Sequence, residues 1–180
     1  MKDKKALKIA MLAISIAVVA VFTIAVRVPT PTGGYLSLCD VAVTFVSFAF
    51  GPIVGLIAGG LGTAFADLIG GYPQWAVISF VVHGLEGLLI GLLVRGTNDA
   101  IWRKIVAGVI ATAVVSLGYF ALTGLFLTTF PEALTEVGPN ALQGGVGAVL
   151  GLALYSAVAA AYRNLDSLRL DFKSSDKKAA

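Results

Sequence analysis

Charged side chains are scarce in this sequence. Asp, Glu, Lys and Arg together supply 13% of its 180 residues, whereas soluble domains carry about 25%. Hydrophobic residues supply 58%, and the mean hydropathy is +0.92. A soluble fold of this size could not bury that much apolar surface, because a large share of any compact domain faces water. The composition therefore argues against a soluble enzyme and predicts a protein whose solvent is lipid.

The residues that build metal and catalytic sites are also scarce. Cys39 is the only cysteine and His83 the only histidine, so an internal disulfide is excluded and no metal-ligand spacing appears. The phosphate-binding loop, the G-x-S-x-G motif and the H-E-x-x-H motif are absent. No basic stripe of the kind that binds nucleic acid is present either. We therefore expect no catalytic site, no metal ion and no cofactor.

Apolar runs of helical length fill most of the chain. They cover about residues 6–26, 37–50, 52–70, 75–94, 105–130 and 141–162. A transmembrane helix needs about 20 such residues, so the second run is short and must tilt or reach only part of the way. The pattern predicts an all-α fold, an integral membrane bundle of six transmembrane helices over residues 1–163. Residues 164–180 are expected to form a charged cytoplasmic tail.

Lysine and arginine are strongly segregated along the chain. If six helices alternate across the membrane, twelve of the 13 lysines and arginines fall on one side, and only Arg27 falls on the other. Basic residues close to the membrane concentrate on the cytoplasmic side. The distribution predicts a multi-pass protein of the plasma membrane with both termini in the cytoplasm.

Small residues recur at helical spacing. Residues 55 and 59, 87 and 91, and 147 and 151 form three G-x-x-x-G motifs, which allow close backbone approach and predict internal helix packing. Ala13 and Ala17 belong to an alanine stripe on the first helix. Such a stripe can pack inward or dock a partner, and the pattern alone favours neither.

Four acidic or histidine residues fall within the apolar runs: Asp40, Asp67, His83 and Glu86. Charged groups at this depth are costly and need a partner, a cavity or a function. His83 and Glu86 share a helix face, so they can orient a polar ligand together or simply satisfy each other across helices. Asp40 completes a Ser-x-x-Asp capping box and could serve only to start its helix. Asp67 lies near a helix end where it opposes the macrodipole, which favours a specific partner.

Aromatic residues gather at the same level as these polar groups. Any single Tyr or Trp there is ordinarily a membrane anchor. Their coincidence with buried polar groups predicts a pocket for a flat, partly polar organic ligand. The glycine-rich loop 29–35 is long enough to fold over such a pocket as a lid. The candidate ligand-binding residues are Tyr35, Asp40, Asp67, Tyr72, Trp75, His83, Glu86, Tyr119, Asn140 and Gln143.

Several stretches resemble one family of membrane proteins, the S components of energy-coupling factor (ECF) vitamin transporters. The resemblance rests on residues 34–40, 50–60, 66–72 and 83–87, together with Trp75, and it extends over residues 5–163. It implies a high-affinity vitamin-binding subunit of an ECF-type ABC importer, with ATP hydrolysed by partner subunits. It also implies docking on a transmembrane coupling subunit that carries two ATPases. Ala13 and Ala17 match the family's docking signature.

The cargo implied by the resemblance is a small heteroaromatic vitamin or precursor. The motifs favour hydroxymethylpyrimidine or pyridoxine, with riboflavin next. The alternative from another class is a solitary proton-coupled secondary carrier that uses Asp67, His83 and Glu86. A bundle this small is poorly suited to alternating access alone, because such transporters usually double a repeat.

Overall fold

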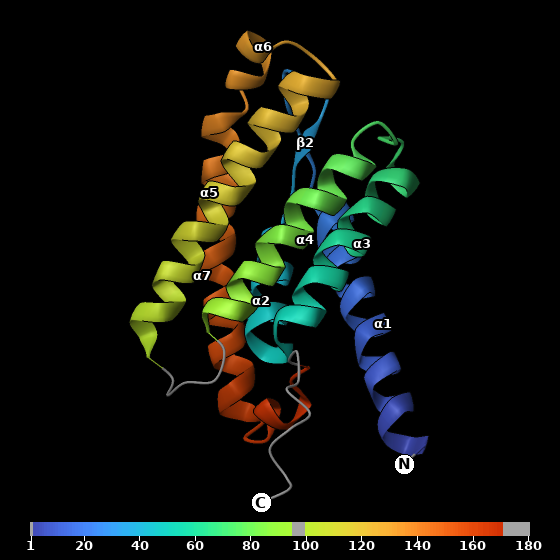
Figure 1. The fold of residues 1–180 in the computed structure, drawn as a ribbon, viewed down its shortest axis with the longest axis vertical. Coiled ribbons are helices and arrows are strands. Elements are labelled where there is room, and N and C mark those ends of the chain that lie inside the picture. The colour runs from blue at the N-terminus through green and yellow to red at the C-terminus, as the bar shows by residue number, and fades with distance from the viewer. Residues whose placement is uncertain (1, 95–99, 171–180) are drawn as a thin grey trace, which may run out of the picture.

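The computed structural model describes residues 2–94 and 100–170, which form a helical bundle with one small β-hairpin (Figure 1). The elements in chain order are α1 (Lys2–Ala25), β1 (Val28–Pro29), β2 (Tyr35–Leu36), α2 (Cys39–Phe50), α3 (Pro52–Gly70), α4 (Ala76–Leu93), α5 (Ile101–Phe126), α6 (Phe130–Leu134), α7 (Val137–Ala161) and the 3₁₀ helix η1 (Leu165–Leu168). The helical character expected from the sequence is confirmed.

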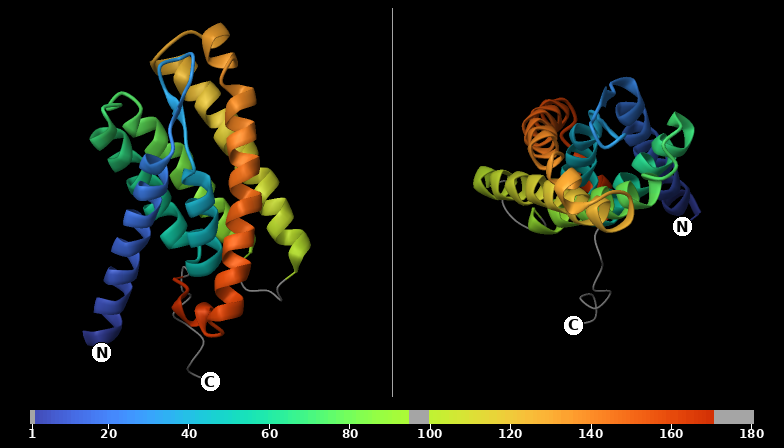
Figure 2. Two further views of the ribbon diagram at one scale, coloured as in Figure 1. Left: turned by 180° about the vertical axis from the view of Figure 1, so that it is seen from behind. Right: turned by 90° about the horizontal axis from the view of Figure 1, so that it is seen from above.

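Five helical stretches are long and apolar enough to cross a membrane. They are Ala6–Ala25, Pro52–Gly70, Ala76–Leu93, Ile101–Phe126 and Phe130–Ala161. α2 has 12 residues, or about 18 Å of helix, which is shorter than the roughly 30 Å hydrocarbon layer. β2 runs directly into α2, and the two together descend through the bundle (Figure 2). The count of six spans therefore stays a prediction.

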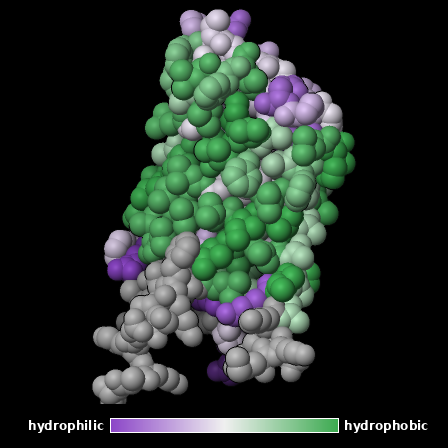
Figure 3. All heavy atoms as spheres, turned by 45° about the vertical axis from the view of Figure 1, so that its right-hand side comes forward, coloured by the Kyte–Doolittle hydropathy of each residue, from purple (hydrophilic) through white to green (hydrophobic). Residues whose placement is uncertain are grey.

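The outer surface of the bundle is apolar. Val77, Val109 and Phe126 are each more than half exposed, and hydrophobic surface covers the middle of the molecule while hydrophilic residues gather toward its ends (Figure 3). Lipid-facing surface has this character, whereas a soluble monomer rarely exposes large contiguous apolar patches. The chain is a multi-pass membrane protein.

The two ends of the bundle differ. The beginning of α1 and η1 lie at one end, whereas the hairpin and α6 lie at the opposite end (Figures 1 and 2). Arg169 and Leu170 close the first of these ends against α2. Arg169 Nη1 donates to the carbonyl of Phe48 at 2.7 Å, and the Leu170 N–H donates to the carbonyl of Phe50 at 2.7 Å. The start of segment 164–180 thus packs on the bundle, and residues 171–180 lie outside the described part.

α2 is the central helix of the bundle. It contacts α1, α3, α4 and α7, and ten of its residues are buried. Gly51, with a φ of 89° that glycine adopts most readily, reverses the chain after α2, and Pro52 opens α3. This arrangement places the first residues of α2, Cys39 and Asp40, in the interior.

Glycines bring the helices around α2 into close contact. A side chain at Gly55 of α3 would collide with the carbonyl of Gly87 on α4, and one at Gly87 would collide with the carbonyl of Gly55. On α7, Gly147 lies against Asp40 and Gly151 against Thr44. The three G-x-x-x-G motifs therefore pack internally, as predicted, and they bring α4 close to α3 and α7 close to the start of α2.

The segment between the fifth and sixth apolar runs, where the sequence predicts a loop, contains structure of its own. Residues 131–140 include most of α6 and the first turn of α7. Thr129 accepts the N–H of Glu132, and Glu132 accepts the N–H of Thr129, which makes a complete capping box. The signal Thr-x-x-Glu was present in the sequence, although the run that follows it is too short to be recognised by periodicity.

Candidate ligand-binding site

A small cavity lies beneath the hairpin, between α1, α2, α3, α4, α5 and α7. Its volume is about 30 Å³, which is room for about one or two water molecules. Seven of the residues predicted to bind ligand line it: Tyr35, Asp67, Trp75, His83, Tyr119, Asn140 and Gln143. The fold therefore gathers most of the predicted polar and aromatic side chains around one space.

His83 occupies the centre of this arrangement and is 2% exposed. Its Nδ1 is 2.8 Å from Oε2 of Glu86, the contact expected from their three-residue spacing. Its Nε2 is 3.2 Å from the Tyr119 hydroxyl and 3.5 Å from the sulfur of Cys39. Tyr119 in turn hydrogen-bonds Ser79 at 2.7 Å. Nδ1 thus contacts a carboxylate, while Nε2 lies beside Tyr119 and Cys39, which line the cavity together with His83.

Asp40 belongs to this cluster and does not cap α2. The residue before α2 is Leu38, which makes no side-chain capping bond. The Asp40 carboxylate instead lies 3.3 Å from His83 Nδ1 and accepts a 2.5 Å hydrogen bond from Nε2 of Gln143. Gln143 Oε1 accepts the N–H of Ser37 at 2.6 Å. Gln143 therefore ties α7 both to the hairpin strand and to the buried carboxylate.

Tyr35 and Asp67 form a second polar contact nearer the hairpin. The Tyr35 hydroxyl donates to Oδ1 of Asp67. Burial, with the Asp67 carboxylate beside it, raises the pKa of Tyr35 far above its usual range, so the hydroxyl stays a donor. Arg27 lies 4.7 Å above the Tyr35 ring and donates to the carbonyl of Ala66 at 2.9 Å. This cation stabilises the C-terminal end of α3 and fixes the base of the hairpin.

The hairpin lies over the cavity, and Gly34 and Tyr35 line it. β1 pairs with β2 in antiparallel register, Val28 opposite Leu36. Between the strands, the Thr32 hydroxyl donates to the buried carboxylate of Glu136, just before α7. Gly34 packs against the Trp75 ring so closely that a side chain there would lie 3.1 Å from it. The loop is therefore fastened to both α4 and α7.

The other three residues predicted to bind ligand do not line the cavity but contact residues that do. Asp40 and Glu86 flank His83, and Tyr72 packs against Tyr35 with ring centroids 4.7 Å apart. Sequence reasoning missed six lining residues: Thr23, Gly34, Ser37, Cys39, Ser79 and Glu136. Ser79 lies one helical turn before His83 and Cys39 is next to Asp40, so proximity to the predicted residues was the available signal. Nothing in the local sequence distinguishes Glu136 from the exposed Glu132.

Buried polar atoms without partners mark where the site is incomplete. Among the described residues, Asp67 Oδ2 and Asn140 Nδ2 accept or donate no hydrogen bond, although both side chains line the cavity. An unpaired buried polar group costs about 1–3 kcal/mol. One acceptor and one donor are therefore available to a ligand between them.

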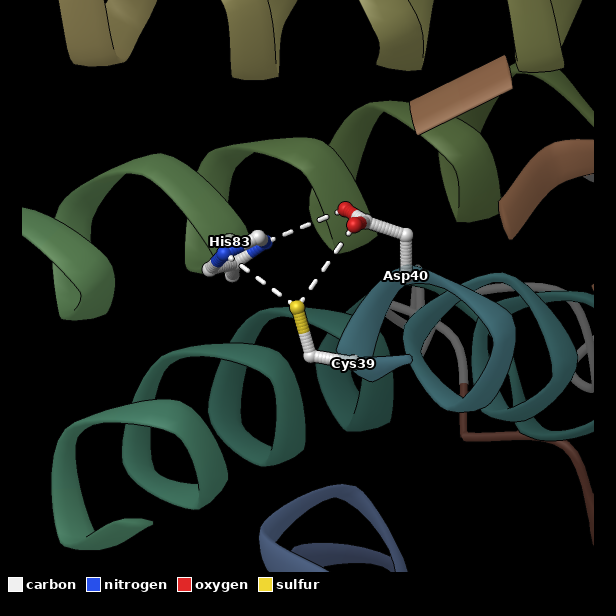
Figure 4. Close-up of side chains that lie close together, drawn as sticks. All are labelled: Cys39, Asp40 and His83. Atoms are coloured by element: carbon white, nitrogen blue, oxygen red, sulfur yellow. Dashed lines mark hydrogen bonds and ion pairs between the residues drawn. The ribbon is translucent and has the colours of Figure 1, made fainter. Parts of the chain in front are cut away.

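Three side chains of different chemistry converge at the inner wall of the cavity. Cys39, Asp40 and His83 each offer one ligand atom, and these atoms all lie within 4.8 Å of one another (Figure 4). Thiolate, carboxylate and imidazole are the three kinds of side chain that bind zinc in proteins. This group could not be expected from local spacing, because Cys39 and Asp40 are far from His83 along the chain.

Comparisons with known proteins point to one family. The family model described as "ECF-type riboflavin transporter, S component" matches residues 3–160. A Pyrococcus woesei protein named "Uncharacterized protein in gap 3'region" is 35% identical over 141 residues, 73% of this chain and 93% of its own length. The thiamine precursor transporter HmpT of Lactococcus lactis is 30% identical over 157 residues, 86% of this chain and 89% of its own length. A UPF0397 protein of Streptococcus pneumoniae is 29% identical over 162 residues, 81% and 86% of the two chains.

Proposed function

The chain belongs to the ECF-type riboflavin transporter S component family, and from this premise we propose that it captures a small heteroaromatic vitamin or vitamin precursor. It then delivers that cargo through an ECF-type ABC importer. The protein itself carries out no chemistry, and partner subunits hydrolyse the ATP.

The main support for the proposal is that two buried polar atoms beside the cavity have no hydrogen-bond partner. Asp67 Oδ2 can accept a hydrogen bond and Asn140 Nδ2 can donate one, and both are buried without partners in the described residues. Trp75 and Tyr119 flank the same space with ring centroids 6.1 Å apart. A flat ring that carries both donors and acceptors fits this set of groups, because it satisfies the polar atoms and stacks on the aromatic ones.

Within this class we favour hydroxymethylpyrimidine or pyridoxine over riboflavin. One relative is named a thiamine precursor transporter, and a cavity of about 30 Å³ must expand even for a single ring. A three-ring flavin would have to displace far more of the packed wall formed by His83 and Tyr119. The small ring therefore requires less rearrangement of the hairpin and of the side chains beneath it.

The proposed docking surface is the outer face of α1. Ala13 and Ala17 are exposed, whereas Ser15 and Val19 on the opposite face are buried in the bundle. Gly62 of α3 packs directly on Val19, so the inward contact of α1 does not use the alanines. A smooth face of small residues allows a helix of the coupling subunit to approach closely. The two ATPase subunits would attach through that coupling subunit.

We further propose that the hairpin end faces outside and the η1 end faces the cytoplasm of a plasma-membrane protein. This orientation follows the lysine and arginine distribution. Cargo would enter beneath the hairpin, the hairpin would close, and the subunit would reorient against its coupling partner.

Native mass spectrometry of the protein, expressed without partner subunits, tests the proposal directly. A copurified hydroxymethylpyrimidine or pyridoxine would support it and identify the cargo. An empty protein would next be titrated calorimetrically with these two compounds and with riboflavin. If none binds, and if vesicles containing this chain alone take up solute in a protonophore-sensitive, ATP-independent way, the proposal is wrong and the proton-coupled carrier replaces it.

A further inference from the structure

We propose that Cys39, Asp40 and His83 bind a divalent transition metal ion of the zinc type at the inner wall of the cavity. This inference goes beyond vitamin capture, because it concerns a cation and three side chains that need no organic ligand. All three side chains are almost completely buried, with 2%, 1% and 2% exposure. Two of them are neighbours at the start of α2, and the third comes from the middle of α4 (Figure 4).

The spacing of the donor atoms fits one small ion. The Cys39 sulfur is 3.5 Å from His83 Nε2 and 3.5 Å from Asp40 Oδ2. A tetrahedral ion about 2.3 Å from sulfur and about 2.0–2.1 Å from nitrogen or oxygen separates such donors by roughly 3.5 Å. Since all three ligand atoms lie within 4.8 Å of one another, rotation of the side chains can bring them onto one ion.

A supporting carboxylate already fixes the histidine ring. Glu86 Oε2 lies 2.8 Å from His83 Nδ1. The other ring nitrogen, Nε2, lies 3.5 Å from the Cys39 sulfur and is left to bind the ion. Histidine ligands in metal sites typically give their other nitrogen to a carboxylate in this way, which sets the tautomer and raises ligand basicity.

A second observation points to an additional occupant. Asp40 Oδ1 accepts no hydrogen bond among the described residues: it lies 3.3 Å from His83 Nδ1, but Glu86 Oε2 already holds that nitrogen at 2.8 Å, and Asp40 is 1% exposed. Gln143 Nε2 occupies only the other oxygen, at 2.5 Å. A cation would neutralise the carboxylate charge that this apolar interior otherwise has to hold with one buried imidazole.

The donor set selects the kind of ion. Mg²⁺ and Ca²⁺ prefer sites made entirely of oxygen donors, whereas one thiolate, one imidazole and one carboxylate suit Zn²⁺ and its analogue Co²⁺. Cys39, His83 and Tyr119 all line the cavity, so a fourth coordination position faces the space beneath the hairpin. Binding replaces the thiol proton of Cys39 by the metal and releases that proton to solvent.

Cobalt titration of the reduced, tag-free full chain, without vitamin, tests the site. The sequence contains one cysteine and one histidine, so a thiolate-to-cobalt charge-transfer band can come only from Cys39. We expect the band and the visible d–d bands of tetrahedral Co²⁺ to saturate at one equivalent. Zn²⁺ should then displace the cobalt and abolish both.

Two variants and a control distinguish a metal site from a cluster that binds no metal. Cys39→Ser should remove the charge-transfer band, and Glu86→Gln should weaken Co²⁺ binding by about 10- to 100-fold, as loss of a supporting carboxylate does elsewhere. Glu132→Gln is the matched control, because Glu132 is exposed on α6 and far from the cluster. If Cys39→Ser does not fold, X-ray absorption of the wild-type zinc complex must find one sulfur and one imidazole ligand. No cobalt binding, or binding without a thiolate band, overturns the proposal.

Discussion

His83 and Glu86 lie one turn apart on α4, with Nδ1 of the ring 2.8 Å from Oε2 of the carboxylate. Both side chains are at most 2% exposed, so neither is in contact with bulk water. The carboxylate therefore holds the ring with Nε2 turned toward Cys39 and Tyr119. The proposed metal site depends on that orientation.

We expect His83→Ala and Glu86→Gln to weaken vitamin binding. Loss of a hydrogen bond to a charged or buried group costs about 1.5–3 kcal/mol, which corresponds to about 10- to 100-fold in Kd. Calorimetric titration with hydroxymethylpyrimidine or pyridoxine provides the measurement, with Glu132→Gln as the control. Wild-type affinity in both cavity variants, with the control also unchanged, would show that the ligand lies elsewhere.

Thr32→Val should loosen the hairpin. The substitution keeps the shape of the side chain but leaves the buried Glu136 carboxylate without its donor from the hairpin. An unpaired buried acceptor costs about 1–3 kcal/mol, so we expect the vitamin to dissociate about tenfold faster, measured by stopped flow. Thr135→Val is the control, because the exposed Thr135 bonds only the carbonyl of Glu132 within α6 and the turn after it. Equal dissociation rates in the two variants would contradict a lid role for the hairpin.

Gly87→Ala should destabilise the bundle. A methyl group there would meet the carbonyl of Gly55, and forced overpacking of this kind typically costs about 1–3 kcal/mol. Gly145→Ala provides the matched control, since Gly145 lies in α7 with nothing within 4 Å of its added methyl group. It should be neutral or more stable by up to about 1 kcal/mol. Thermal unfolding in detergent would separate the two variants, and equal melting temperatures would refute the close α3–α4 contact.

Enlarging the alanines on α1 should disrupt assembly with the ATPases. Ala13→Leu with Ala17→Leu adds bulk to an exposed helix face without touching the core, so the isolated protein should fold and bind vitamin normally. We expect about tenfold less coupling and ATPase subunit to copurify, because overpacking an interface costs at least about 1 kcal/mol. Ala153→Leu with Ala157→Leu, an exposed pair at the same spacing on α7, is the control. The docking assignment fails if both double variants copurify equal amounts.

Much of the bundle could be predicted because its signals are local. Apolar runs bounded by Gly51-Pro52 and by Gly70-Gly71 set the ends of α3, which begins at Pro52 and ends at Gly70 as expected. The three-residue spacing of His83 and Glu86 likewise predicted a contact between them. The short hairpin and α6 were harder to predict, because two-residue strands and a five-residue helix have no usable periodicity.

The composition of the cavity wall could be predicted only in part. Asp40 had two possible roles in the sequence, and tertiary packing decided between them, since Gly147 of α7 lies against it and Gln143 bonds it. Glu136 and Cys39 reach the cavity for the same reason: glycine contacts between distant segments set the approach of α7 to the start of α2 and of α4 to α3. Such contacts leave no pattern in the neighbouring residues.

The glycine contact between α3 and α4 also divides the cavity into a stationary half and an adjustable half. Gly55 and Gly87 bring the two backbones together, so these helices cannot slide or separate without losing that fit. Gly59 of α3 packs on the His83 carbonyl in the same way, so we expect His83 to keep its place against α3 when cargo enters. Expansion of the cavity is then expected from the hairpin and the first turns of α7. Part of the recognition surface is thus preorganised, and the entropic cost of ordering falls mainly on the remainder.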